Sequence, residues 1–308
     1  MRMFSRIEVK KELTLEETKT DKKAYSLKWL KVLLNSKTGT LGLIIVVFMV
    51  LMAILANVIA PHDPAQTDVV NRLVPPVWAE GGNPDYILGT DNLGRDILSR
   101  IIVGSRVSLL VGISAVFLAG AIGLVLGLIS GYYGGFFDRV IMRTVDAFLA
   151  IPNILFMLIV LAVIGPSLMT LIFVLGATTW VMYARMVRGE TLSIKERDYV
   201  RSARAVGAKD IRIISRYILP NIISSFIVIA TLNVATTIIL ESSLSFLGLG
   251  IQPPDVSWGL MLSDGREYLA TSWWVATFPG VAITITVLGI IFLGDWLRDV
   301  LDPKTKTN

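Results

Sequence analysis

The chain contains no cysteine, a single histidine and few charged residues. Of its 308 residues, 17% are Asp, Glu, Lys or Arg and 54% are hydrophobic. The absence of cysteine excludes a disulfide framework and a thiolate metal site. His62 has no His/acid cluster around it, so we expect a solvated loop residue and no metal site.

Catalytic and nucleotide-binding motifs are missing as well. The sequence has no zincin motif, no nucleophile elbow and no G-x-x-x-x-G-K-[ST] loop. We therefore expect no catalytic residue and no enzyme activity in this chain. If ATP powers it, another chain must bind the ATP. The net charge of +5 is explained by the loops described below, so nucleic-acid binding is not expected.

What the sequence does have is a series of long apolar runs. The mean hydropathy is +0.67, and the runs are long enough to cross a bilayer core of about 30 Å. We predict an all-α integral membrane protein in contact with the lipid bilayer. Pro152 should bend the third span. The six predicted transmembrane helices are residues 40–60, 105–130, 140–164, 168–187, 222–240 and 274–293.

The distribution of basic residues orients these spans. Residues 1–38 carry ten Lys/Arg, and residues 184–218 carry nine against four acids. The long loop 61–104 carries only three Lys/Arg beside six acids. By the positive-inside rule, the first two segments are cytoplasmic and the loop is extracytoplasmic. Both termini are then predicted to be cytoplasmic.

The same reading divides the chain into segments. Polar residues of mixed charge predict a disordered N-terminus, and alternating Leu and Lys predict an amphipathic helix on the inner membrane surface, or else an extension of span one. The predicted organisation is a disordered segment at 1–25, an interfacial helix at 26–37, a transmembrane domain at 38–298 with an outer loop at 61–104 and a cytoplasmic loop at 184–221, and a cytoplasmic tail at 299–308.

The basic cytoplasmic loop has the pattern of two short helices joined by a turn. Ser202 and Ala203 precede Gly207, which suits a short helix ended by a residue that tolerates positive φ. A second helix is predicted to run up to Pro220. We expect a knob with a small-residue face that inserts into a groove on a soluble partner.

Glycines and a few polar residues mark the spans themselves. A glycine at every fourth position draws a strip on one helix face, which indicates close packing against another helix or a share in lining a pathway. The strip comprises Gly123, Gly127, Gly131 and Gly135. Arg143 and Asp146 are three residues apart in span three, and we expect them to form an ion pair.

Span five carries the polar residues that are candidates for a transport pathway. Asn233, Thr236 and Thr237 precede Glu241 at its outer end. These side chains either line a hydrated pathway or, in the case of Thr, bond to carbonyls of their own helix.

Two segments outside the spans have distinctive patterns. Alternating Asp and Arg in residues 88–100 predict an ordered ion-pair network. Paired Pro and Gly interrupt the apolar run at 244–259, as in a re-entrant or capping loop. Such a loop would gate a pathway, meet a partner or cover the core.

Four separated motifs together resemble the second permease subunit of dipeptide and oligopeptide ABC importers. They are Gly-Thr-Asp-Asn-Leu-Gly-Arg-Asp at 89–96, Leu-Ser-Phe-Leu-Gly-Leu-Gly-Ile-Gln-Pro-Pro at 244–254, Ser-Trp-Gly-Leu-Met-Leu-Ser-Asp at 257–264 and Gly-Asp-Trp-Leu-Arg-Asp-Val-Leu-Asp-Pro at 294–303. The similarity runs from about residue 30 to residue 304. The outer-loop segment Pro-Pro-Val-Trp-Ala-Glu-Gly-Gly at 75–82 is similar to the dipeptide branch.

The resemblance implies a type I ABC importer permease bundle in a prokaryotic cell membrane, with a cytoplasmic coupling helix. In the family's coupling motif, a Glu-Ala-Ala triplet is followed by a Gly and later by a Leu-Pro pair. Here the triplet is replaced by Arg-Ser-Ala, so the family's acid is absent. The residues that match the motif are Arg201, Ser202, Ala203, Gly207, Leu219 and Pro220.

The resemblance also implies partners. They are a second homologous permease, two ATPase subunits that bind ATP and Mg, and an extracytoplasmic peptide-binding protein. This chain would have no cofactor of its own. Related permeases carry other cargo, namely nickel, glutathione or oligosaccharides. The competing class is an ion-coupled secondary transporter, which would need intramembrane acids and an internal repeat.

Overall fold

The computed structural model describes residues 36–301, and these residues form helices joined by loops. The predictions for residues 1–25, for most of 26–37 and for 302–308 lie outside the described residues. In chain order the elements are α2 (Lys37–Ile59), η1 (Val69–Asn71), α3 (Ile97–Tyr133), α4 (Gly135–Ala150), α5 (Asn153–Ile164), α6 (Leu168–Lys195), α7 (Asp198–Ala205), α8 (Asp210–Ile213), η2 (Ile214–Ile218), α9 (Leu219–Phe246), α10 (Trp258–Gly265), η3 (Arg266–Tyr268) and α11 (Trp274–Leu301).

Among residues 36–301, five helices are long and apolar enough to cross a membrane. They are α2, α3, α6, α11 and the continuous helix from Asp210 to Phe246. The third predicted span is a pair of helices, α4 and α5, which meet at 88°. The break falls at Ile151 and Pro152, and Pro152 has no N–H to extend a helix through this point. The bend is confirmed, and it is sharp enough to make two helices of one predicted span.

Capping explains why α3 starts before the predicted boundary at residue 105. The carboxylate of Asp96 accepts hydrogen bonds from the N–H and the hydroxyl of Ser99, at 2.9 and 2.6 Å. This N-cap starts the helix at Ile97. At 37 residues, α3 is about 55 Å long and extends well beyond a bilayer core.

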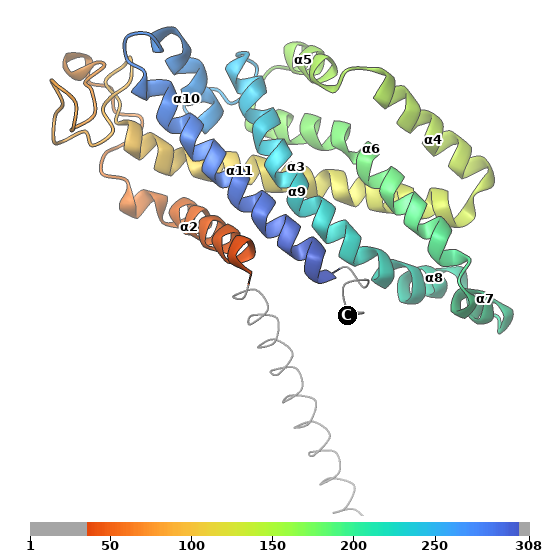
Figure 1. Ribbon diagram of the computed structural model, residues 1–308. Helices are drawn as coiled ribbons and strands as arrows, with labels where there is room; N and C mark the ends of the chain where they lie inside the picture. Colours follow the sequence, from red (N-terminus) through yellow and green to blue (C-terminus); the bar gives the residue numbers. More distant parts are fainter. Residues whose placement is uncertain (1–35, 302–308) are drawn as a thin grey trace, which may run out of the picture.

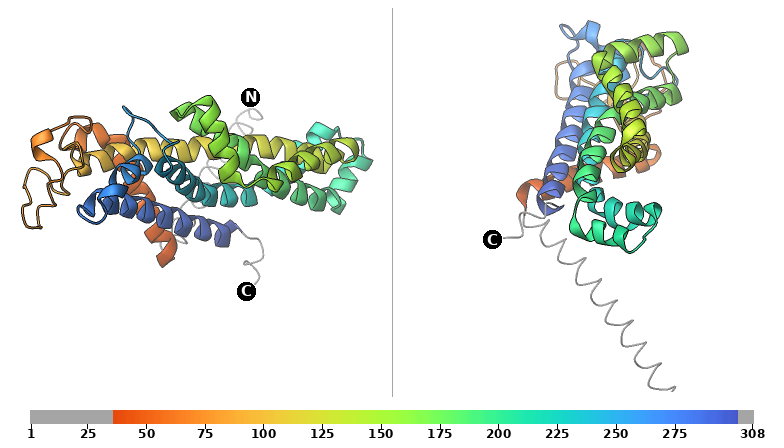
Figure 2. Two further views of the ribbon diagram at one scale, coloured as in Figure 1. Left: turned by 90° about the horizontal axis from the view of Figure 1, so that it is seen from above. Right: turned by 90° about the vertical axis from the view of Figure 1, so that its right-hand side faces the viewer.

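The molecule is elongated, with loops gathered at its two ends (Figures 1 and 2). The outer loop that precedes α3 lies with α10 at one end, and α7 and α8 lie at the opposite end. Helices α3, α6, α9 and α11 run along the length between them, and α2 packs against α11 and α3. The two ends are therefore suited to separate contacts.

Glycines allow α3 and α6 to approach each other closely. A Cβ atom on Gly127 would lie 2.7 Å from the carbonyl oxygen of Ala184, and one on Gly123 would lie 2.4 Å from Cβ of Tyr183. Gly131 packs on Thr191 in the same way, so the predicted packing strip is confirmed for these three glycines. Gly135 does not belong to it, because α3 ends at Tyr133 and a Cβ on Gly135 would meet nothing within 4 Å.

Candidate functional site

The segment 198–213, here called the knob, consists of α7, a turn and α8. The turn is a Schellman motif: the N–H of Ala208 donates to the carbonyl of Ala203 at 3.1 Å, and the N–H of Gly207 donates to the carbonyl of Arg204 at 3.0 Å. Gly207 has φ +82°, a conformation that glycine adopts without the steric cost of a side chain. The predicted glycine-terminated short helix is confirmed.

The second helix of the knob does not stop at Pro220. From α8 the chain passes through a π-helical turn, Ile214–Ile218, directly into α9. The result is one continuous helix of 37 residues from Asp210 to Phe246. Pro220 lies in the first turn of α9, where the wider turn before it accommodates a residue without an N–H. Leu219 and Pro220 therefore join the knob to span five instead of separating them.

Buried contacts attach the knob to α3 and α6. Val200 and Ile213 are fully buried in a cluster with Val187 and Ile194 of α6. The Tyr132 hydroxyl of α3 donates to the Asp210 carboxylate at 2.6 Å. The knob is thus held rigidly at the end of the bundle.

The exposed face of the knob differs from the small-residue face that we predicted. Ala203 is 8% exposed and lies on the inward face with Val200, three residues earlier. The prediction of an outward Ala203 is therefore wrong, whereas Ser202 and Gly207 are exposed. The outward apolar surface consists of Val206, 84% exposed, and Ile211, 72% exposed.

Arg201, which replaces the acid of the family motif, pairs within its own chain. Its guanidinium donates to the Glu196 carboxylate at 2.7 Å. This hydrogen bond lowers the pKa of Glu196, and both side chains are exposed. The positive charge at this position is thus partly offset by an acid that precedes the knob.

The four polar residues predicted as one face of span five lie on two faces of α9. Thr236 is exposed and Asn233 is partly exposed, and the Thr236 hydroxyl donates to the Asn233 main-chain carbonyl at 3.0 Å. Thr237 and Glu241 are buried, at 2% and 0% exposure. A step of one residue turns the helix by about 100°, which separates the exposed Thr236 from the buried Thr237, and Asn233 lies between these two directions.

Glu241 is the centre of a buried hydroxyl cluster. The hydroxyls of Ser245 and Ser257 donate to its Oε1 at 2.8 and 2.9 Å, and that of Ser242 lies 3.4 Å from Oε2. Ser257 is also the N-cap of α10. The carboxylate thus joins α9 to the loop that leads into α10.

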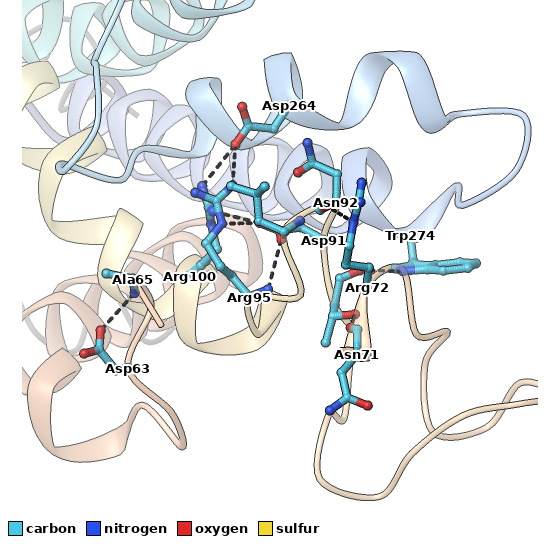
Figure 3. Close-up of polar contacts among 12 residues, drawn as sticks. Asp63, Ala65, Asn71, Arg72, Asp91, Asn92, Arg95, Arg100, Asp264 and Trp274 are labelled. Atoms are coloured by element: carbon cyan, nitrogen blue, oxygen red, sulfur yellow. Dashed lines mark hydrogen bonds and ion pairs between the residues drawn. The ribbon is translucent and has the colours of Figure 1, made fainter. Parts of the chain in front are cut away.

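Ion pairs hold the start of α3 and the helix α10 together (Figure 3). Asp91 accepts from the guanidinium groups of Arg95 and Arg100, each at 2.7 Å. The same two arginines donate to Asp264 of α10 at 3.0 and 3.2 Å. The predicted network within residues 88–100 is confirmed, and Asp264 is the member that the sequence pattern did not indicate.

The loop 244–259 covers the end of the bundle opposite the knob (Figure 1). Trp258, at its end, is fully buried, and its indole N–H donates to the Ile101 carbonyl at 2.9 Å. Trp274 likewise donates to the Thr90 carbonyl at 3.1 Å. Of the roles predicted for the loop 244–259, covering the core is the one that the burial and the hydrogen bond of Trp258 support.

Two further predictions were wrong. Asp146 accepts from Arg185 of α6 at 3.2 Å and not from Arg143, which is exposed on α4. His62 is not a freely solvated residue: its Nδ1 lies 3.6 Å from the Asp96 carboxylate, its ring lies tilted against that of Tyr86, and its main-chain N–H donates to the Ser99 hydroxyl at 2.9 Å. In both cases long-range packing supplied a partner that local spacing does not reveal.

A hollow of about 870 Å³ opens beside the knob, between α6, α9 and α11. Its lining is polar at several points and includes one acid and two arginines. The residues that line it are Glu190, Ser193, Ile194, Arg197, Pro220, Asn221, Ser224, Ser225, Val228, Ile229, Leu232, Arg298 and Leu301. Apart from Pro220, none of these was among the predicted site residues. Ser225 is eleven residues before Thr236 and so lies on nearly the same face of the helix. Helical spacing from Thr236 would therefore have indicated Ser225 as a candidate site residue.

Comparison with known proteins agrees with this architecture. Residues 123–307 match a model of the family described as binding-protein-dependent transport system inner membrane component. Residues 28–76 match the N-terminal transmembrane domain of oligopeptide transport permease C. The chain is also similar in fold, at a TM-score of 0.54 and 22% identity, to a chain of the inward-facing MetNI methionine ABC transporter, covering 66% of this chain and 96% of that one.

Curated relatives match over most of their length. The chain is 44% identical to the dipeptide transport system permease protein DppC of Haemophilus influenzae, over 88% of this chain and 92% of that protein. It is 40% identical to the di/tripeptide transport system permease protein DppC of Pseudomonas aeruginosa, over 88% and 90%. The identity is also 40% to the oligopeptide transport system permease protein OppC of Bacillus subtilis, over 94% and 93%. The chain belongs to the family of binding-protein-dependent transport system inner membrane components, the permease subunits of ABC importers.

Proposed function

We propose that this chain forms half of the translocation pathway of an ATP-driven importer for dipeptides and short oligopeptides, which an extracytoplasmic binding protein delivers. The cargo assignment is supported by relatives at 40–44% identity whose names specify dipeptide, di/tripeptide and oligopeptide transport. The other half of the pathway comes from a second, homologous permease.

The observation that carries the coupling role is the knob. It lies at the opposite end of the molecule from the outer loop, is fixed to α3 and α6, and exposes Val206 and Ile211. The basic composition of residues 184–218 favours a cytoplasmic location, with both termini on the same side. An exposed apolar pair on a rigid projection in water suits a docking contact.

The knob then transmits a conformational change made by other subunits. Two ATPase subunits bind ATP and Mg, and their closure moves the knobs of the two permeases together. ATP bound to the ATPase subunits thereby shifts the equilibrium between two arrangements of the transmembrane helices. This chain supplies no catalytic group and no cofactor to the cycle.

The test is uptake of a labelled dipeptide by vesicles containing the two permeases, the ATPases and the binding protein. We expect uptake that requires ATP and the binding protein and that stops when the ATPase subunits are omitted. Uptake without an ATPase, driven by an ion gradient, would show a secondary transporter instead. If the complex works only with nickel, glutathione or an oligosaccharide, the transporter class stands and the peptide cargo is wrong.

A further inference from the structure

The hollow beside the knob contains charges that have no partner among residues 36–301. Glu190 of α6 is half-buried in its wall, and Arg197 and Arg298 stand at its rim. Among residues 36–301, none of these three side chains takes part in an ion pair or hydrogen bond. Other charges nearby are paired, such as Arg188 with Asp138 and Arg201 with Glu196. The Glu190 carboxylate and the two guanidinium groups do not pair with one another. They can therefore bind a ligand that carries both a positive and a negative charge.

The wall of the hollow is continuous with the polar face of span five. On α9, Leu232 and Thr236 follow Ser225 by seven and eleven residues, so each lies within about 20° of Ser225 around the helix. The exposed Thr236 thus stands directly beyond the hollow along one helix face. On α6, Ser193 is eleven residues after Met182, whose sulfur lies 3.8 Å from the Asn233 amide. The faces of α6 and α9 that line the hollow thus extend along both helices from Asn233 and Thr236 to Glu190, Arg197 and Arg298.

The spacing of the charges fits a short peptide. Glu190 lies five residues, about 8 Å, before the end of α6 at Lys195, and Arg197 follows two residues beyond that end. An extended dipeptide spans about 7 Å from its amino to its carboxyl end, and a hydrogen bond at each end extends its reach. A guanidinium group binds a carboxylate through two parallel hydrogen bonds, which favours Arg at the carboxyl end.

We infer that the hollow is an exit-side binding site for zwitterionic short peptides, in which Glu190 receives the terminal ammonium group and Arg197 and Arg298 receive the terminal carboxylate. Ser193, Asn221 and Ser225 supply hydrogen bonds to the peptide backbone between the two charges. The inference rests on the proposed function and adds a site to it. The permease would then select peptides with free termini a second time, after the binding protein has selected them.

Protection from labelling tests the site directly, because the chain has no cysteine of its own. Ser225→Cys is introduced, and the complex of both permeases and the ATPases is treated with a thiol reagent without the binding protein. Labelling of this chain is followed after separation on a denaturing gel. The ligands are dialanine and its doubly blocked analogue N-acetyl-dialanine amide, at millimolar concentration.

We expect dialanine to slow labelling and the blocked analogue to have no effect. Adding Glu190→Gln should weaken the apparent affinity for dialanine about tenfold, the loss typical of one charge-assisted hydrogen bond. The matched control is Arg185→Gln, which removes a charge from the same helix outside the hollow and should leave protection unchanged. Arg298→Gln should behave like Glu190→Gln.

Besides a failure of dialanine to protect the cysteine, three outcomes would overturn the site. They are equal protection by both ligands, protection that survives Glu190→Gln, and a cysteine that is unreactive in the assembled complex but reactive in the isolated chain, which would mean that the second permease fills the hollow. Dialanine uptake by the complete transporter is measured in parallel. Uptake without protection rejects the site alone, whereas absent uptake rejects the proposed peptide cargo.

Discussion

Arg100 of α3 and Asp264 of α10, 164 residues apart in sequence, are joined at 3.2 Å by a guanidinium group that is 1% exposed. The same guanidinium holds Asp91 at 2.7 Å. One buried cation therefore fixes both the outer loop and α10 to the start of the second span. Removal of the cation would leave two carboxylates facing each other with only Arg95 between them.

We expect Arg100→Met to destabilise the protein by about 3–5 kcal/mol, the usual cost of leaving one side of a buried ion pair uncompensated. The measurement is thermal unfolding of the detergent-solubilised complex. Arg72→Met is the control, because Arg72 is exposed and bonds only to the Asn92 carbonyl. An Arg100 variant that unfolds at the same temperature as the Arg72 variant would contradict the role of this network.

Gly127→Ala should lower stability by about 1–3 kcal/mol, as overpacking does, because the added Cβ would lie 2.7 Å from the Ala184 carbonyl oxygen. Gly189→Ala is the matched control: Gly189 is exposed in α6 and has nothing within 4 Å of the added atom. There the better helix propensity of alanine should leave stability unchanged or raise it. Equal effects of the two substitutions in thermal unfolding would argue against close packing of α3 on α6.

Val206→Glu should reduce co-purification of the ATPase subunits and uncouple ATP hydrolysis from transport, because it places a charge on the exposed apolar surface of the knob. Insertion and pairing with the second permease should be normal. Ala203→Glu should instead damage the knob itself, because a charge would enter a site that is 8% exposed. Full ATPase binding and coupled transport by the Val206 variant would remove the knob as the docking site.

Single cysteines test the orientation of the chain. Asp85→Cys in the outer loop should react with a membrane-impermeant thiol reagent in intact cells, and Ser202→Cys in the knob should not, although both positions are exposed. Ser257 and Ser272 are unsuitable sites, since they are 0% and 5% exposed. Reaction at position 202 alone would place the knob outside and invert the proposed topology.

The features that could be predicted from the sequence are those that depend on a single segment of the chain. Gly207 was predicted at the end of a short helix because positive φ selects glycine, and Gly123, Gly127 and Gly131 were predicted to pack because their spacing is that of a helix face. Long apolar runs similarly predicted the spans. Each of these features depends on one segment and its immediate environment.

The predictions that were wrong concern whether a side chain faces the bundle or the solvent, and which residue it contacts. Ala203 is small because it lies against the bundle, and small residues suit both a buried contact and an exposed one. Asp146 forms its ion pair with Arg185 of another helix and not with Arg143 of its own helix. The hollow escaped prediction because Glu190, Ser225 and Arg298 come from three helices and meet only after folding.

The unbroken helix from Asp210 to Phe246 has a mechanical consequence. Its 37 residues make a rod about 55 Å long, with the knob at one end and the Glu241 cluster near the other. A tilt of about 10° around its middle would carry each end through about 5 Å, in opposite directions. Such a swing would pull Glu241 and Ser245 against the serine that caps α10. The far end of the molecule would then be levered open or shut without any intervening hinge.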